Sequence, residues 1–215
     1  MRAGTGPFAL VGAAILTGAA ILAASPGAAS AATAKTWTVR PGGKIAAISG
    51  KIVLTDTPTG ATMWCGSSRM SGPLRSGSGL PGTGIGSLTT AVFSQCSAGP
   101  FPATVTARGL PWRLNLTSYD RSTGVARGTI SHLQINAAPS FAQCTAVIKG
   151  TSGTAPDGVV AVSYTSKTGI LKILRTDGNL HWYHVQSCAG IIRNGDTATL
   201  STSYTVSPRQ VITSP

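Results

Sequence analysis

Most of the chain beyond its N-terminal segment alternates hydrophobic and polar positions with the period of two that is typical of β-strands. The clearest stretch is 112–119, where Trp112, Leu114 and Leu116 would share one face of a strand. Residues 129–137 repeat this period after a short turn. The two stretches together predict a hairpin with one buried and one solvated side.

A strict alternation through 129–137 divides its side chains between two faces. Ser131, Leu133 and their odd-numbered neighbours would lie on one face, and Ile130 and His132 with their even-numbered neighbours on the other. His132 would then stand among polar side chains on the solvated face.

Similar short runs, each bounded by turn-forming residues, predict strands along the rest of the chain. These runs are 35–39, 44–49, 51–55, 61–65, 88–96, 103–108, 144–149, 159–165, 170–175, 180–188 and 197–206. About a dozen short strands, with no sustained helical period between them, predict an all-β fold that is an antiparallel sandwich or barrel.

The segment 72–86 interrupts this pattern, because six of its 15 residues are glycine and two are proline. Glycine weakens strands and proline removes a ladder donor, so we expect a flexible, exposed loop, whose glycines would also permit a tight bend at a sheet corner. A repeated Thr-Val-x-Pro, at 38–41 and 205–208, suggests that the first and last strands pair and close a barrel or seal a sheet edge.

The N-terminal segment has the features of a secretory signal peptide. Arg2 precedes an apolar run at 8–24, which Ser-Pro-Gly ends, and small residues then lead to a cleavage site after Ala31. Cleavage after Ala34 is the second option, and an uncleaved membrane anchor is the alternative, although a run of about 17 residues is short for a span. We therefore divide the chain into a signal peptide, 1–31, and a single secreted β-domain, 32–215.

All four cysteines follow the leader, and an even number in an exported chain predicts two disulfides. Three pairings are possible. We favour Cys65–Cys96 and Cys144–Cys188, because each pair encloses a similar segment and Ser-Gln-Cys-Ser-Ala-Gly around the second cysteine resembles Gln-Ser-Cys-Ala-Gly around the fourth. The absence of any Cys-x-x-Cys argues against a zinc site.

The charge is strongly one-sided, with a net charge of +12 and five acids, all of them Asp. Arg2 is the one charged residue of the leader, so the secreted part carries +12 − 1 = +11. Such a balance favours anionic partners such as wall polymers, lipid headgroups or nucleic acid. The basic residues are dispersed and form no run of the kind that binds nucleic acid, so we expect no nucleic-acid partner.

Candidate catalytic and cofactor motifs give little support for an enzyme. The G-x-G-x-x-G match at 77–82 contains Pro81 and is not expected to open a helix, so no dinucleotide site is predicted. The sequence has no G-x-S-x-G elbow, and its five Asp stand in turn-like contexts. We predict no catalytic, cofactor-binding or metal-binding residues, and the protein is expected not to be an enzyme.

Three histidines are the natural general bases near neutral pH. His181 and His184 are three apart on a predicted strand, so they would face opposite sides and chelate no metal together without a bulge. His184 is expected near the core beside Trp182 and Cys188, and His132 is expected in solvent. Structural or solvated roles are favoured for all three.

Five aromatic residues are candidates for a platform that binds sugars or apolar ligands. For Trp112 and Trp182, core packing is the favoured interpretation, because both lie on probable inward faces. The five residues are Trp64, Trp112, Tyr119, Trp182 and Tyr183.

The chain resembles a family of uncharacterised secreted proteins of high-GC Gram-positive bacteria over nearly all of its secreted part. The resembling pieces are the Ala-rich leader, the Gly-rich 77–86, Phe93-Ser-Gln-Cys96, Leu110-Pro-Trp112, Gly178-Asn-Leu180 and Tyr204-Thr-Val-Ser-Pro208. The resemblance implies secretion and a β-fold, and it brings no activity and no site residues.

The sequence therefore favours a non-enzymatic secreted β-domain that associates with the anionic cell envelope or with a secreted partner. The alternative is a carrier of a small apolar ligand or an enzyme inhibitor, and an unrecognised extracellular hydrolase is the third hypothesis. We expect an extracellular location, no cofactor and no stable insertion into a membrane after cleavage.

Overall fold

A computed structural model describes residues 35–141 and 143–215. The expected signal peptide and both expected cleavage sites lie outside these residues. The described part contains 16 β-strands and no helix, which confirms the all-β fold. The strands are β1 (Thr36–Arg40), β2 (Gly43–Ser49), β3 (Ile52–Asp56), β4 (Thr62–Leu74), β5 (Gly77–Pro81), β6 (Gly86–Leu88), β7 (Thr90–Ala98), β8 (Phe101–Arg108), β9 (Trp112–Asp120), β10 (Val125–Pro139), β11 (Thr145–Lys149), β12 (Gly158–Thr165), β13 (Ile170–Ile173), β14 (His181–Gln186), β15 (Ala198–Ser207) and β16 (Val211–Thr213).

The main sheet closes on itself as an antiparallel barrel. Its hydrogen-bonded neighbours run from β4 through β6, β9, β10, β12, β13, β15 and β2 back to β4. A second circuit runs from β4 through β7, β8, β10, β11, β14, β15 and β3 back to β4, with one isolated bridge joining β14 to β15. Closure removes the exposed edges that an open sheet would leave.

Both circuits share the three longest strands, β4, β10 and β15, which run the length of the barrel. At the remaining positions two short strands lie end to end. For example, β2 and β3 follow one another along the same side of β4, with Gly50 and Lys51 between them. Because of these interruptions, the 13 strands of the main sheet form a barrel with only eight strand positions in each circuit.

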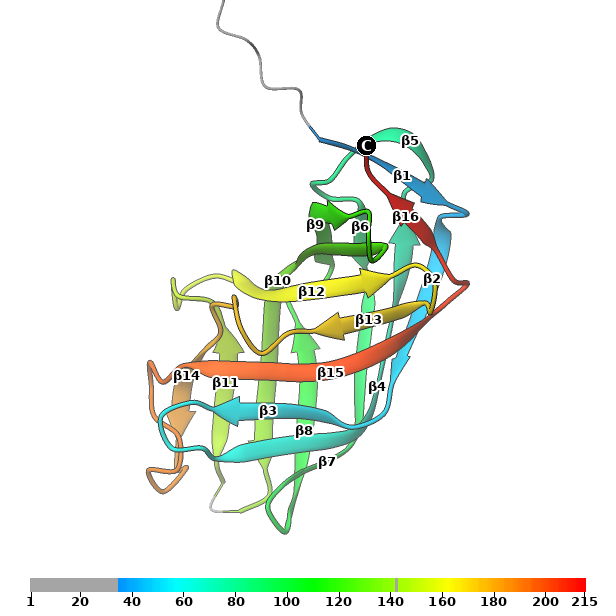
Figure 1. Cartoon of the computed structure of the whole chain (residues 1–215). Helices are drawn as coiled ribbons and strands as arrows, with labels where there is room; N and C mark the ends of the chain where they lie inside the picture. The colour runs from blue at the N-terminus through cyan, green and yellow to red at the C-terminus, as the bar shows by residue number, and fades with distance from the viewer. Residues whose placement is uncertain (1–34, 142) are drawn as a thin grey trace, which may run out of the picture. The chain divides into compact units, whose positions relative to one another are not determined.

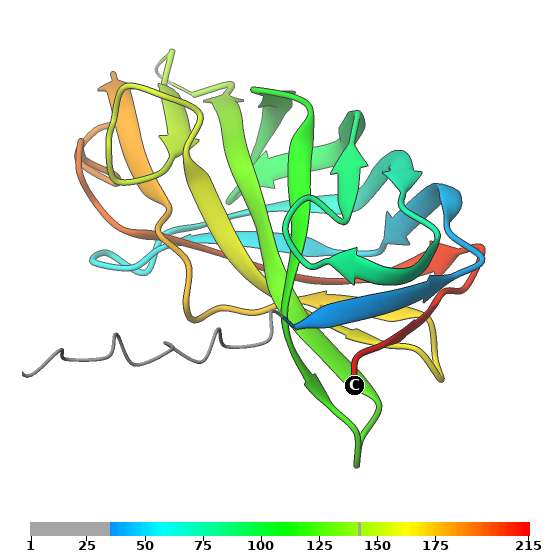
Figure 2. The ribbon, with the colours of Figure 1, turned by 90° about the horizontal axis from the view of Figure 1, so that it is seen from above.

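A small three-stranded sheet lies beside one end of the barrel, with β1 between β5 and β16 (Figures 1 and 2). Trp37 and Val39 of β1 are fully buried beneath it. The expected pairing of 38–41 with 205–208 is therefore wrong, because Val39 pairs with Ile212 of β16 instead. The chain turns between β15 and β16, and this turn places β16 beside β1.

The expectation of a flexible loop at 72–86 is also wrong. Leu74 ends the long strand β4, Gly77–Pro81 forms β5 against β1, and Ile85 is completely buried. At Gly72 a Cβ atom would collide with the backbone oxygen of Ser87, so glycine is what lets the two segments approach. The second expectation for 72–86, a tight bend at a sheet corner, fits the observed structure better than a loop does.

One contiguous hydrophobic core fills the barrel, and Trp112, Leu114 and Leu116 point into it as predicted. The strict alternation predicted for 129–137 is wrong at one point. Ile130 and Leu133 are both buried, because a bulge at His132, whose φ is 66°, shifts the register between them.

Both predicted disulfides are confirmed, Cys65–Cys96 and Cys144–Cys188. Cys65 and Cys96 are direct partners across β4 and β7. Disulfides persist in oxidising compartments, so this pairing is consistent with an extracellular location. Within the described residues there is no helix with the length and apolar character that crossing a bilayer requires.

Candidate functional site

The outer wall of the barrel is hollowed into an open groove where both neighbours of β15 are interrupted at the same level. On one side β13 ends at Ile173, opposite Thr202. On the other side Gly50 and Lys51 separate β2 from β3. Beyond Ile173 the chain leaves β15 but stays hydrogen-bonded to β12, where Leu174 N donates to Ala161 O. Strands β13, β15 and β3 lie side by side around this point (Figure 1).

Three cationic side chains and a row of hydroxyl groups surround the groove, which we call the cationic groove. Lys51, Lys172 and Arg175 are all exposed, and no acidic residue lines the groove in the described part of the chain. Its lining residues are Gly50, Lys51, Val53, Lys172, Ile173, Leu174, Arg175, Ser201, Thr202 and Ser203.

Neighbouring side chains hold two of the cations in place. Lys51 Nζ lies 5.2 Å from the ring centroid of Trp64, a cation–π arrangement, and Trp64 is 36 % exposed. Arg175 Nη2 lies 3.5 Å from Thr55 Oγ1, the limit for a hydrogen bond. The nearest acid along the chain is Asp177, whose carboxylate lies 3.4 Å from the hydroxyl of Thr176. The groove therefore presents positive charge and hydroxyl donors.

Sequence reasoning did not find this groove. Lys51 and Lys172 come from strand ends more than a hundred residues apart, and neither stands in a recognisable motif. A general excess of positive charge was the one available signal, and it does not indicate where cations meet.

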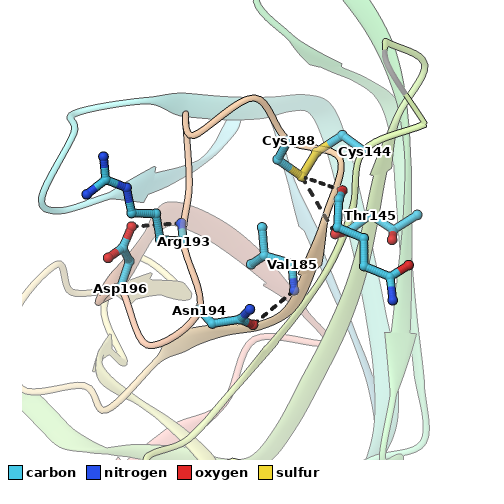
Figure 3. Close-up of a disulfide and its surroundings, with 8 residues drawn as sticks. Cys144, Thr145, Val185, Cys188, Arg193, Asn194 and Asp196 are labelled. Carbon is cyan, nitrogen blue, oxygen red and sulfur yellow. Dashed lines mark hydrogen bonds between the residues drawn. A yellow bond between two sulfur atoms is a disulfide. The ribbon is translucent and has the colours of Figure 1, made fainter.

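The end of the barrel away from β1, β5 and β16 (Figure 1) holds an apolar cavity of ≈ 50 Å³, which we call the mouth cavity. The disulfide Cys144–Cys188, which Figure 3 shows in close-up, is among its lining residues. Its lining residues are Ala61, Thr62, Met63, Ala98, Ala137, Pro139, Phe141, Cys144, Ala146, Trp182, Cys188, Ile191 and Ile192. Two further apolar cavities along the described barrel measure ≈ 20 and ≈ 30 Å³. None of these three cavities is large enough to be a chamber for a large ligand.

The three histidines do not assemble a catalytic triad in the described part of the chain. His132 Nδ1 lies 3.3 Å from the hydroxyl of the adjacent Ser131, and no aspartate is among its contacts. His181 Nδ1 lies 2.9 Å from Asn179 O. Among the described residues no cluster of three or more potential metal-binding side chains occurs.

His184 lies in solvent, so its expected place near the core is wrong. Residue 184 has a φ of 50° and stands at a bulge where β14 shifts register against β11. This bulge turns the ring outward, where Nε2 lies 3.4 Å from Lys149 Nζ. Tyr183 also lies beside this lysine, with 5.4 Å between Nζ and the ring centroid.

The five aromatic candidates do not form one platform. Trp112 and Trp182 are buried in the core, as the inward faces of their strands predict. Trp64 lies on the outer wall beside the cationic groove, and Tyr119 instead packs edge-on against Trp37.

No protein-family model, curated protein or solved structure matches this chain.

Proposed function

We propose that this protein is a non-enzymatic extracellular β-domain that binds anionic polymers of the cell envelope through the cationic groove. The observation that carries the proposal is the convergence of Lys51, Lys172 and Arg175 on a groove lined by no acid. Phosphate or carboxylate groups of a polymer would supply the counter-charges, and the hydroxyls of Ser201 and Ser203 would add hydrogen bonds.

The carrier version of the alternative function has less support. The interior cavities of ≈ 20, ≈ 30 and ≈ 50 Å³ would hold a few apolar atoms each and not a whole lipid-sized ligand. An open groove on the outer wall suits a long polymer better, because it does not enclose the ligand.

Retention on anionic cell-wall fractions tests the proposal. The mature protein should be retained at low salt and released as salt screens the charges. Replacing Lys51, Lys172 and Arg175 by Ala should weaken retention about 100-fold, if each cation contributes about 1 kcal/mol.

A matched control removes three exposed arginines away from the groove, Arg40, Arg75 and Arg121, by the same change to Ala. Both variants lose the same net charge. If the control weakens retention as much as the groove variant does, net charge alone explains binding and the groove assignment is wrong. Absence of salt-sensitive retention of the unmodified protein would contradict the proposal as a whole.

A further inference from the structure

The outer wall beside the cationic groove carries an exposed tryptophan. Trp64 of β4 pairs with Val53 of β3, and Val53 pairs with Ser201 of β15. All three alternate with buried residues along their strands, so their side chains face outward. Val53 and Ser201 line the groove, and neighbouring strands lie about 5 Å apart. The wall of the groove therefore continues, one strand further, into an aromatic ring.

Trp64 differs from the other tryptophans of the chain. Trp37, Trp112 and Trp182 are at most 4 % exposed and belong to the core, whereas Trp64 is 36 % exposed. The electron-rich face of an exposed tryptophan suits the C–H groups that a sugar ring presents on its flat side. Lys51 Nζ lies 5.2 Å from the centroid of this ring, so an aromatic surface and a cation of the groove lie side by side.

A carboxamide lies close to the same ring. Gly66 follows Trp64 by two residues on the outer face of β4, and the exposed side chain of Gln95 passes over it. A Cβ atom at Gly66 would lie 2.7 Å from Gln95 Oε1, so glycine leaves room for this amide on the wall. Two residues along a strand span about 7 Å, which places the amide within reach of the hydroxyl groups of a sugar seated on Trp64.

We propose that Trp64 and Gln95 form a saccharide subsite that extends the cationic groove, so that the polymer bound there is an anionic glycan. This inference rests on the proposed function, because the groove must hold the charged groups of the polymer. One sugar ring would stack on Trp64, its hydroxyls would hydrogen-bond with the amide of Gln95, and an acidic group would contact Lys51. A charged polymer without sugar rings would use the cations alone.

Two polymers with the same charged group test the subsite by isothermal titration at low salt. Polygalacturonate carries carboxylates on sugar rings, and poly-L-glutamate of equal carboxylate number carries them without sugar. Trp64→Leu should weaken polygalacturonate binding about 10-fold and poly-L-glutamate binding about twofold at most, since both lose the ring that positions Lys51 and only the first loses a stacked sugar. Trp64→Phe keeps a ring and should retain most of this difference. Gln95→Gly, which suits the φ of 55° at this position, should weaken polygalacturonate binding about threefold.

Tyr183→Leu is the matched control, because Tyr183 also lies beside a lysine, with 5.4 Å between its ring centroid and Lys149 Nζ, but on β14. It should leave the binding of both polymers unchanged. The subsite is wrong, and the groove assignment stands, if poly-L-glutamate alone binds or if Trp64→Leu weakens both polymers equally or neither. An equal loss of polygalacturonate binding in Tyr183→Leu has the same meaning. If the unmodified protein binds neither polymer, the proposed function fails and the subsite fails with it.

Discussion

At the scale of single residues, Asp120 shows how a turn stabilises its own carboxylate. Its Oδ1 accepts hydrogen bonds from the hydroxyl of Ser122 at 2.6 Å and from Ser122 N at 2.9 Å. These bonds, the Ser122 side chain first, together with those of Thr123, lower the pKa of Asp120 from 3.8 to about 2. Hydrogen bonds to the ionised form favour it, so the turn is tightest when Asp120 is charged.

This depressed pKa predicts a pH-dependent contribution to stability. Because the folded value lies below the unfolded one, the contribution is present above pH 3.8 and is lost as the pH falls toward 2. Asp120→Asn should therefore lower the melting temperature at pH 6 and lower it much less near pH 2, as measured by circular dichroism. Ser122→Ala should lose part of the same contribution. An Asp120→Asn variant with an equal deficit at both pH values would contradict the assignment.

At the scale of strands, bulges and close backbone contacts set the register of the barrel. Opposite Gly128 of β10, strand β9 contains an extra residue, since Arg127 pairs with Ser118 and Gly128 pairs with Leu116. A Cβ atom at Gly128 would collide with the backbone oxygen of Asn115. Backbone atoms cannot move aside as a flexible side chain can, so this position requires glycine.

Gly128→Ala should accordingly destabilise the protein by about 1–3 kcal/mol, the range expected for overpacking, in denaturant unfolding. Gly50→Ala is the matched control, because a Cβ there meets no atom within 4 Å. The control should be neutral or slightly stabilising, since alanine reduces the entropy of the unfolded chain. Equal effects of the two substitutions would show that the β9 contact does not constrain the register.

At the scale of the whole molecule, the two disulfides should contribute similarly to global stability and differently to local order. Their sequence separations are 31 and 44, and on the chain-entropy model each contributes roughly 4 kcal/mol. Cys65 and Cys96 join strands that are already paired along their length, whereas β14 meets β15 through a single bridge. The Cys144–Cys188 bond lies just beyond the last pair of β11 and β14, Thr145 with Gln186, and tethers the start of the loop that follows β14.

Replacing either cysteine pair by Ala should thus lower the free energy of unfolding by a comparable amount. Hydrogen exchange should separate the two variants. Loss of Cys144–Cys188 should accelerate exchange of the amides of Ile191 and Gly195, which donate to Cys188 O and Trp182 O. Loss of Cys65–Cys96 should leave these two amides protected. Equal acceleration in both variants would mean that the loop depends on global stability alone.

The sequence by itself determined the fold class, most of the strands and both disulfides. These follow from local information: side chains alternate with period two along a strand, turn residues mark its ends, and an even number of cysteines pairs in an exported chain. The local pattern failed at Ile130, His184 and 72–86. Near Ile130 and near His184, a bulge exchanges the buried and the exposed face of the strand. In 72–86, glycine is needed because another backbone segment passes close to Gly72, and not because the segment is a loop.

The tertiary structure alone decided which distant residues meet. Closure of the barrel depends on pairings such as β10 with β12 and β15 with β2, which no short stretch encodes. The cationic groove gathers Lys51 and Arg175 because two strands end at the same level of β15. The mouth cavity likewise appears only when the alanines of separate strands face one another. Alternation shows which side of a strand is buried, and register determines what lies opposite it.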